Sequence, residues 1–457
     1  MRFIPNNGPV VREMLDVIGL PDVEALFDSI PAEARLGRPL DIPPGMSEEA
    51  QLRLFEALAE RNEGREYTAF LGAGSYSHHV PLAIDSIIQR GEFLTSYTPY
   101  QPEISQGTLQ AIFEFQTFIT ILTGMEVANA SMYDGASATA EAVLMAGRLA
   151  RGRSRVLLSA ALHPHYRRVV DTHTRFLDLE PDTVPIDGKS GRMYGAALAS
   201  MLDDGVCCVV VQQPNRYGVI EDIAAIAEKT RAAGALLVVS VNEALSLALL
   251  ETPGRLGADI VVGEAQSFGT ALQYGGPYLG FMATREAHRR QLPGRIAGAT
   301  LDAEGRRGFV LTLATREQHI RRGKATSNIC TNENLVMLSA LIYLTLMGRE
   351  GLRDVARRNL SQLRYFLDRL AGARGYAPAF STPGFNEVTV SCPRPAAEIV
   401  ARCANRRIVP GLDLARWDDA LTDARTDLLL VAVTETSTKA GIDALIEALV
   451  EAGEAGQ

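Results

Sequence analysis

Several short polar turns that follow apolar stretches contain residues suited to chemistry. The turn E-A-Q-S-F-G-T at 264–270 follows the apolar stretch D-I-V-V-G and precedes a Gly-Gly-Pro sequence at 275–277. A lysine in this turn could form an imine with a carbonyl compound, but position 266 holds glutamine. The amide nitrogen of Gln266 has a delocalised lone pair and cannot form an imine. Only four of the 45 basic residues are lysines (Lys189, Lys229, Lys324 and Lys439), and of these only Lys324 lies in a motif-like setting.

The stretch Y-D-G-A-S-A-T at 133–139 could bind an anion. It lies between a strand-like segment and a helix, so backbone N–H groups at the helix start and the hydroxyls of Ser137 and Thr139 could surround a phosphate. A tight turn with a capping serine explains the same residues without a ligand. The candidate anion-binding residues are Gly135, Ala136, Ser137 and Thr139.

Other candidates follow two further predicted strands. His163, in H-P-H after the strand R-V-L-L-S, would lie at the carboxyl end of a strand, where open α/β sheets bind ligands. A capping or core role is the alternative for His163. Asn242 and Glu243 follow the strand A-L-L-V-V-S-V, and the sequence does not decide which of them faces a pocket.

Two adjacent histidines, His78 and His79, follow a Gly-rich stretch that lacks the third glycine of a dinucleotide fingerprint. On an extended segment, neighbouring side chains face opposite ways, so the pair could not easily chelate one metal together. No metal site is predicted.

An irregular segment, S-Y-T-P-Y-Q-P-E-I-S-Q-G at 96–107, crowds polar side chains before a helix. Its two prolines disfavour regular structure, and a loop that costs conformational entropy to order usually lines a site or an interface. A structural crossover with buried tyrosines is the alternative.

The segments that must position these residues alternate apolar strands with amphipathic helices between about 66 and 320. Strands such as V-C-C-V-V-V-Q are apolar throughout, which indicates a mostly parallel sheet covered on both faces and hence a large three-layer α/β domain. The pattern beyond about residue 325 predicts a smaller C-terminal α+β domain with long helices. The pattern from residue 1 to about 65 predicts an arm that contains a helix capped by Ser47. The predicted domains are 1–65, 66–325 and 326–457.

Composition argues against several classes of protein. The 457 residues carry a formal net charge of -9 without a dense Lys/Arg stripe, which argues against a nucleic-acid partner. No apolar run approaches the roughly 20 residues that span a bilayer, and the start lacks the apolar core of a signal peptide, so we expect a cytoplasmic protein without a membrane partner. Five cysteines without C-x-x-C spacing indicate neither a disulfide framework nor a zinc site.

The order of the candidates along the chain matches one kind of cofactor site. A pyridoxal phosphate (PLP) enzyme of fold type I has a phosphate loop, a residue that covers the ring, an acid for the pyridinium nitrogen and a Schiff-base lysine. The first two positions have candidates in 135–139 and His163. Asn242 or Glu243 stands at the third position, and Gln266 stands at the fourth. The sequence therefore predicts a PLP-dependent transferase scaffold of fold type I without its reactive lysine.

Five longer motifs carry a resemblance to a known family. The chain resembles the N-terminal half, or subunit 1, of the glycine decarboxylase P proteins of the glycine cleavage system. The motifs are T-P-Y-Q-P-E-I-S-Q-G (98–107), Y-D-G-A-S-A-T-A-E-A (133–142), Q-Q-P-N-R-Y-G-V-I-E-D (212–222), G-E-A-Q-S-F-G-T-A-L-Q-Y-G-G-P-Y-L-G-F (263–281) and T-R-E-Q-H-I-R-R-G-K-A-T-S-N-I-C-T-N (315–332). The family occurs as one long chain or as two subunits, and this length fits the split form.

The resemblance implies an activity and a set of partners. It implies that the chain is subunit 1 of glycine dehydrogenase (aminomethyl-transferring, decarboxylating). This enzyme decarboxylates glycine with PLP as the electron sink and transfers the aminomethyl group to the lipoyl-lysine of H protein. In the split form subunit 2 binds PLP covalently, so we expect this chain to be its partner without bound cofactor. A heterodimer and an α2β2 assembly both remain open.

The resemblance also sets expectations for individual residues. Side chains of the 96–107 segment are expected to reach into the PLP pocket of subunit 2 or to brace its wall; they are Thr98, Tyr100, Gln101, Glu103 and Gln106. The residues 135–139 and 324–328 are expected to be remnants of a degenerate second site, with His163 as a possible ring-stacking position. One alternative is a non-catalytic scaffold or docking subunit, and another is a self-sufficient PLP enzyme that uses Lys324.

Overall fold

The computed structural model describes residues 6–150, 152–329, 332–417 and 425–454, which divide into two compact units. The first unit, Met1–Arg65, contains two α-helices, α1 (Gly8–Ile18) and α2 (Glu48–Glu60). As the sequence predicts, the Ser47 side chain caps α2 by accepting a hydrogen bond from the Ala50 backbone N–H. The second unit, Glu66–Gln457, holds all the candidate site residues.

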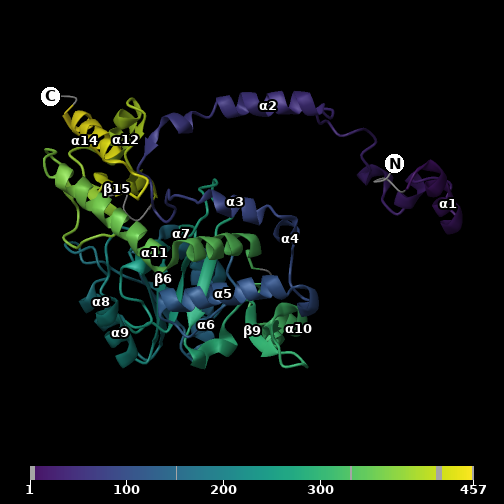
Figure 1. The fold of residues 1–457 in the computed structure, drawn as a ribbon, viewed down its shortest axis with the longest axis horizontal. Helices are drawn as coiled ribbons and strands as arrows, with labels where there is room; N and C mark the ends of the chain where they lie inside the picture. Colours follow the sequence, from purple (N-terminus) through teal and green to yellow (C-terminus); the bar gives the residue numbers. More distant parts are fainter. Residues whose placement is uncertain (1–5, 151, 330–331, 418–424, 455–457) are drawn as a thin grey trace. The chain divides into compact units, whose positions relative to one another are not determined.

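A seven-stranded sheet forms the centre of the second unit (Figure 1). Its strands, in the spatial order β2-β8-β7-β6-β5-β3-β4, are β2 (Val127–Ala128), β8 (Gly280–Thr284), β7 (Ile260–Glu264), β6 (Leu236–Val241), β5 (Val206–Gln212), β3 (Arg155–Ser159) and β4 (Glu180–Val184). The strands from β7 to β4 are parallel, and β8 runs antiparallel to both β7 and β2. The mostly parallel sheet confirms the predicted fold class.

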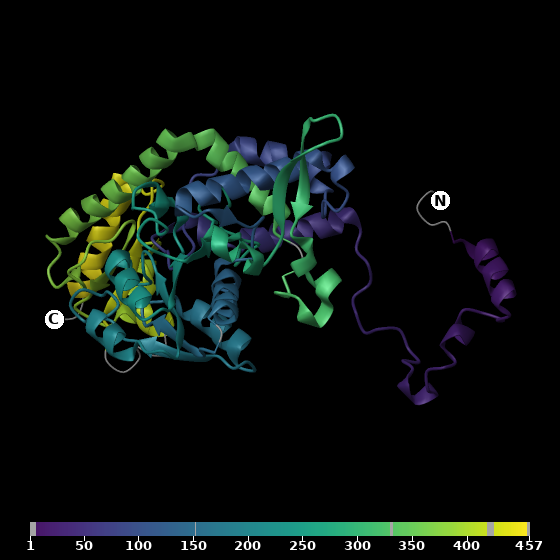
Figure 2. The same ribbon diagram turned by 90° about the horizontal axis from the view of Figure 1, so that it is seen from below.

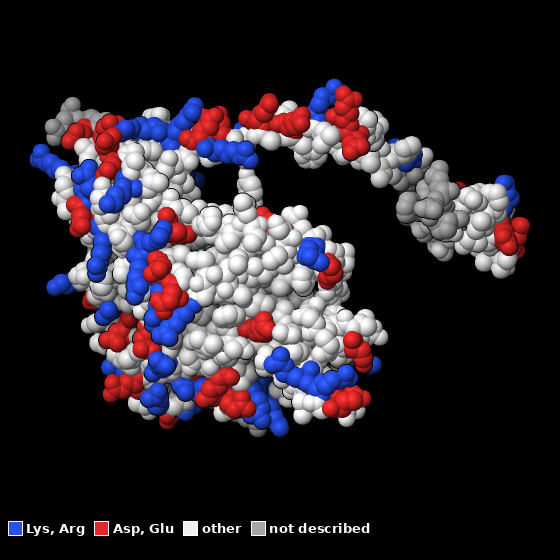
Figure 3. Space-filling view, viewed as in Figure 1, with Lys and Arg blue, Asp and Glu red and all other residues white. Residues whose placement is uncertain are grey.

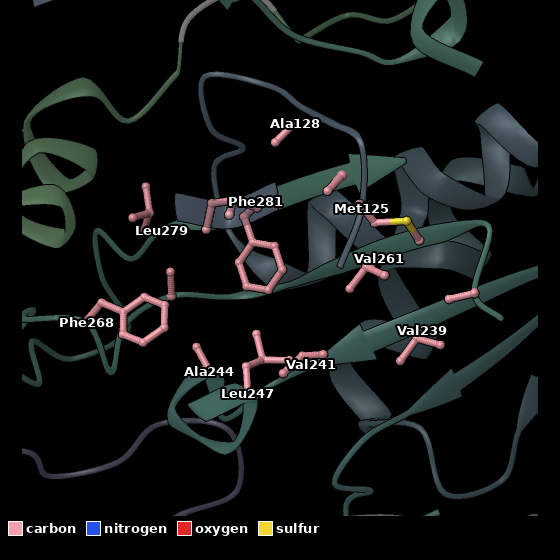
Figure 4. Close-up of a cluster of buried hydrophobic side chains, with 14 of the residues drawn as sticks. Met125, Ala128, Val239, Val241, Ala244, Leu247, Val261, Phe268, Leu279 and Phe281 are labelled. Carbon is pink, nitrogen blue, oxygen red and sulfur yellow. The ribbon is translucent and has the colours of Figure 1, made fainter. Parts of the chain in front are cut away.

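Successive residues of each central strand enter two different cores, because their side chains point to opposite faces. Val209 and Val211 of β5 pack in one hydrophobic cluster, and Val210 packs in another. Figure 4 shows part of the first cluster, where Phe268 and Phe281 lie among aliphatic side chains. The first core includes residues of α5 (Gln106–Thr123) and α9 (Ile223–Ala232), and the second includes residues of α6 (Gly135–Leu149) and α7 (Pro164–Thr174). Burial on both faces explains why these strands are apolar throughout.

A second, antiparallel sheet has the strand order β11-β12-β15-β14 and packs on C-terminal helices. The elements are β11 (Ala377–Pro378), β12 (Glu387–Ser391), β14 (Leu412–Asp413), β15 (Leu428–Ala432), α12 (Ala396–Ala404) and α14 (Lys439–Glu454). The remaining short elements of this unit are β1 (Thr68–Ala69), β13 (Ile408–Val409), α3 (Leu82–Ile88), α4 (Gly91–Leu94), α8 (Gly195–Met201), α10 (Gln318–Arg321) and α13 (Leu414–Trp417).

Helix α11 (Asn334–Leu370) connects the two sheets. Gly348, with φ of 58°, interrupts it. Residues of α11 as far as Ala356 pack in the core of the large sheet, and Leu363, Phe366 and Leu370 pack in the core of the small sheet. Among the described residues, α11 alone is long and apolar enough to cross a membrane by length and composition. Its apolar part before Gly348 is shorter than the roughly 20 residues that a bilayer requires.

A β-hairpin that could not be predicted from the sequence is formed by β9 (Ile296–Leu301) and β10 (Arg307–Thr312). Figure 2 shows it projecting from the rest of the second unit. The side-chain amide of Gln116, on α5, bonds both backbone groups of Ala297 in β9. This contact fixes the hairpin against α5.

Substitution of two phenylalanines, one buried and one exposed, tests which residues form the core. Phe281 is 1% exposed and Phe176 is 91% exposed. Replacing Phe281 with alanine should destabilise the chain by about 3–5 kcal/mol, because it removes a buried ring and leaves a cavity. Thermal unfolding should show a Tm lower by several degrees for Phe281→Ala and nearly unchanged for Phe176→Ala. Equal Tm values for the two variants would contradict this position of the core.

Candidate functional site

The Gln266 side chain bonds the backbone of a segment far away in the sequence. Its Nε2 donates to the Tyr76 carbonyl at 3.1 Å and to the Thr270 carbonyl at 2.7 Å. Its Oε1 accepts from the Tyr76 N–H at 3.0 Å. Both hydrogen-bonding groups of the buried amide are therefore satisfied by backbone, and the segment around Tyr76 lies directly against position 266.

Glu387, on β12, holds the same segment from the small sheet. Its Oε1 accepts a hydrogen bond from the Ala73 N–H at 2.6 Å, and its Oε2 accepts one from the Tyr76 hydroxyl at 3.1 Å. Burial raises the pKa of Glu387 to about 7. The residues 72–78 thus bridge the ends of the central strands and the small sheet.

The backbone of this segment also covers His163. His163 Nδ1 accepts a hydrogen bond from the His165 N–H at 3.1 Å, so the ring proton lies on Nε2, which donates to the Ala73 carbonyl at 3.0 Å. Burial lowers the pKa of His163 to about 3, which keeps the ring neutral. A Cβ atom on Gly74 would lie 3.2 Å from His163 Cδ2 and 3.4 Å from Asn242 Nδ2. The Ala73–Gly74 backbone therefore lies against the Nε2–Cδ2 edge of the histidine ring.

The two candidates for the acid position point in different directions. Asn242 Oδ1 accepts a hydrogen bond from Ser240, and its Nδ2 is buried near Gly74 without a hydrogen-bond partner. Glu243 instead bonds His78 Nε2 at 3.0 Å and the Leu245 N–H at 2.9 Å. An amide therefore faces the position that an acid would need in order to hold a pyridinium nitrogen.

His78 is clamped between two carboxylates. Its Nε2 lies 3.0 Å from Glu243 Oε2, and its Nδ1 lies 2.8 Å from Glu435 Oε2. Burial lowers the pKa of His78, but the two carboxylates outweigh burial and raise it to about 10. His79 is exposed, and its backbone N–H bonds Glu435. The two histidines therefore act separately, and the described residues contain no group of three or more His, Cys, Asp or Glu that could hold a metal ion.

Carboxylates of the chain itself occupy the N-terminus of α6. The Gly135 N–H donates to Glu264 Oε2 at 3.0 Å, and the Ser137 N–H donates to Asp134 Oδ1 at 2.7 Å. The hydroxyl of Thr139 donates to the Gly135 carbonyl. Burial raises the pKa of Glu264 to about 7. A helix N-terminus stabilises anions, and here Asp134 and Glu264 take the N–H groups that a phosphate would use.

These contacts do not fit a PLP molecule. Gln266 cannot form the imine, and Asn242 offers an amide in place of an acid. The carboxylates at α6 would repel a phosphate, and the His163 ring already packs against the Tyr166 ring, with 4.8 Å between ring centres. This part of the chain therefore offers no residue through which a PLP-dependent step could pass.

Four of the five predicted interface residues lie on the segment before α5, Gln106 is the first residue of α5, and β10 and the residue before β9 support the segment. The guanidinium of Arg295, just before β9, donates to the Thr98 hydroxyl at 3.3 Å and to the Tyr100 hydroxyl at 2.9 Å. Gln106 bonds both backbone groups of Phe309 in β10. Gln101 and Glu103 are exposed between these two anchors. Sequence reasoning missed Arg295, because the residues around it form no recognisable motif.

The segment 324–328 lies against the middle of α6. The Ser327 hydroxyl donates to Glu141 Oε1 at 2.7 Å, and the Thr326 N–H donates to the Arg316 carbonyl at 3.1 Å. Residues 325–328 also line a groove of about 870 Å³ together with Arg148 and other residues. The structure thus does not bring this segment to Gln266.

Architecture and site together define a class of protein. A large, mostly parallel sheet with a smaller antiparallel sheet, and candidate residues at the strand ends, define the fold of type I PLP-dependent enzymes. Glutamate decarboxylase of Lactobacillus brevis has this fold, with a TM-score of 0.68 at 12% sequence identity over 93% of this chain and 98% of its own. At this identity the likeness shows the fold alone.

The chain belongs to the glycine cleavage system P-protein family, whose family model matches residues 1–449. "Probable glycine dehydrogenase (decarboxylating) subunit 1" of Anaeromyxobacter dehalogenans is 53% identical over 432 residues, 94% of this chain and 96% of its own. The protein of the same name in Rhodospirillum centenum is 51% identical over 458 residues, 99% of each chain. A crystal structure of glycine decarboxylase (P-protein) of the glycine cleavage system, in inhibitor-bound form, matches with a TM-score of 0.88 at 42% identity, over 98% of this chain and 99% of its own.

The His78 clamp predicts a pH-dependent contribution to stability. The folded-state pKa of about 10 lies above the ordinary value of 6.5, so the stabilisation is complete below about pH 6.5 and is lost as pH rises through 10. The Tm difference between the unmodified chain and His78→Gln should therefore shrink steadily between these values. His79→Gln, which changes the exposed neighbour, should show a small and constant difference. A His78→Gln difference that does not change with pH would contradict the charged clamp.

Proposed function

We propose that this chain is subunit 1 of glycine dehydrogenase (aminomethyl-transferring, decarboxylating) and completes the active site of a PLP-carrying subunit 2 in the cytoplasm. Family membership and the names of the relatives support the activity. One observation supports the different roles proposed for this chain and subunit 2. The chain closes its own cofactor position with residues 72–78, while it exposes a second, well-braced group of polar side chains at 98–106.

Side chains of the exposed loop fit a role at a neighbouring active site. Tyr100 is 54% exposed, and Gln101 and Glu103 are exposed beside it. Bound PLP would supply the electron sink for loss of the glycine carboxylate. Tyr100, Gln101 and Glu103 would line that pocket from the outside, orient glycine or the lipoyl arm of H protein, and exclude water.

The surface beside this loop supports a large protein partner. Figure 3 shows a broad area with few charged side chains over α3, α5 and the first half of α11. Within these three helical segments only Asp85 and Glu114 are charged. Leu82, Ile121 and Leu346 are exposed there. A large exposed apolar area indicates a protein interface, and subunit 2 is the partner that the names of the relatives imply.

Two loop variants test the catalytic role directly. Tyr100→Ala and Glu103→Gln should each lower kcat for glycine-dependent CO2 exchange with H protein by on the order of tenfold or more, because misplaced substrate groups react slowly. Activity should also require both subunits. Tyr194→Ala, a change at an exposed tyrosine outside the loop, is the matched control and should leave kcat unchanged. Unchanged kcat for both loop variants in an intact complex would favour a scaffold subunit instead.

Restoring the lysine tests whether this chain can hold the cofactor. Gln266→Lys, incubated alone with PLP and reduced with borohydride, should carry no pyridoxyl group by mass spectrometry, because Glu387 and His163 still hold residues 72–78 and the carboxylates still bond the α6 N–H groups. Subunit 2 treated in the same way should carry one. A pyridoxyl group at position 266 would contradict the closed site.

A further inference from the structure

The exposed loop must be held rigid if it is to serve a neighbouring active site. Ordering a residue's backbone costs conformational entropy, and the 96–101 part has no regular structure of its own. The described contacts give this loop two anchors. Gln106 bonds Phe309 at one end, and Arg295 contacts Thr98 and Tyr100 at the other.

Arg295 is unusually placed for a charged residue. It is 1% exposed, and its Nε has no hydrogen-bond partner. Glu317, also buried, lies 3.7 Å from this Nε and balances the charge. A buried ion pair contributes little net stability because both charges lose their water. The position of Arg295 is therefore better explained by what its guanidinium holds than by the stability of the fold.

The guanidinium fixes the orientation of the Tyr100 ring. Its Nη2 donates to the Tyr100 hydroxyl at 2.9 Å, and its Cζ lies 5.0 Å from the centre of the same ring. The His319 ring lies edge-on to Tyr100, with 6.0 Å between ring centres. The planar fork of arginine makes both contacts at once, which a lysine ammonium does not reproduce. Tyr100 is thus held at its hydroxyl and beside its ring, while half of its surface stays exposed.

From this arrangement we infer that Arg295 is a positioning residue for the reaction, which sets the place of Tyr100 and Thr98 at the active site of the complex. The inference rests on the proposed function, since it requires the loop to meet the site of subunit 2. Arg295 itself is covered and acts through the two hydroxyl side chains. Its loss would misplace them without removing any group that touches glycine.

A double-mutant cycle in the assembled complex measures this role. The complexes carry Arg295→Lys, Tyr100→Phe, or both changes, and kcat and KM are measured in the exchange assay together with Tm and assembly. We expect each single change to lower kcat by on the order of tenfold, with KM changed little. The double variant should fall no further than the lower single variant, because both changes break the same contact.

Arg216 provides a matched control for burial. It is also a buried arginine whose guanidinium bonds a tyrosine hydroxyl, at 2.5 Å from Tyr217, and lies over that ring at 4.7 Å. Arg216→Lys should lower Tm about as much as Arg295→Lys and leave kcat unchanged. If Arg295→Lys and Arg216→Lys both lower kcat in proportion to their loss of Tm, the positioning role is overturned.

The outcomes separate this inference from the proposed function. If the Tyr100 variants lower kcat but Arg295→Lys does not, the positioning role fails and the proposed function stands. The same follows if the kcat losses of Arg295→Lys and Tyr100→Phe multiply in the double variant. If the changes at Tyr100 and Glu103 all leave kcat unchanged, the proposed function fails. Should Arg295→Lys not assemble, the double variant Thr98→Val with Tyr100→Phe removes both hydroxyl acceptors, and unchanged kcat there overturns the inference.

Discussion

The hydrogen bonds between the Gln266 amide and the Tyr76 backbone set the condition on which the rest of the site depends. An amide can donate and accept at once, so it can satisfy both groups of a backbone residue that an amine could not. With Tyr76 held there, Glu387 and His163 bind the neighbouring backbone at Ala73. The position that a cofactor would occupy in this fold becomes part of the protein interior.

This closure explains several features that otherwise look unrelated. Glu264 and Asp134 bond the N–H groups of α6 that a phosphate would need. His78 joins Glu243 of the large sheet region to Glu435 near the small sheet, so its ion pairs link the two parts of the second unit. The chain thus has the scaffold of its fold class, and residues 72–78 pack against side chains at the strand ends. Polar groups available to a partner remain on the loop from Thr98 to Glu103, which Arg295 braces from beneath.

Local patterns predicted much of the fold, and long-range contacts explain what they missed. Apolar strands and the helix cap at Ser47 could be recognised because neighbouring residues determine them. The fold class and the family were predicted correctly, whereas the β9–β10 hairpin was not. The partners of Gln266 and His78 could not be predicted, because Tyr76 lies 190 residues from Gln266 and Glu435 lies 357 residues from His78. Arg295 is close to Tyr100 only after folding, at a separation of 195 residues.

We propose that catalysis by this chain takes place at the boundary with its partner and not in its own pocket. A structure of the complex with subunit 2, PLP and glycine would give the deciding distance, from the Tyr100 side chain to the bound cofactor and substrate. We expect Tyr100 to contact the PLP pocket of subunit 2, with heavy atoms within about 4.5 Å. A complex in which the Thr98–Gln106 loop faces solvent, or in which PLP lies beside Gln266, would contradict it.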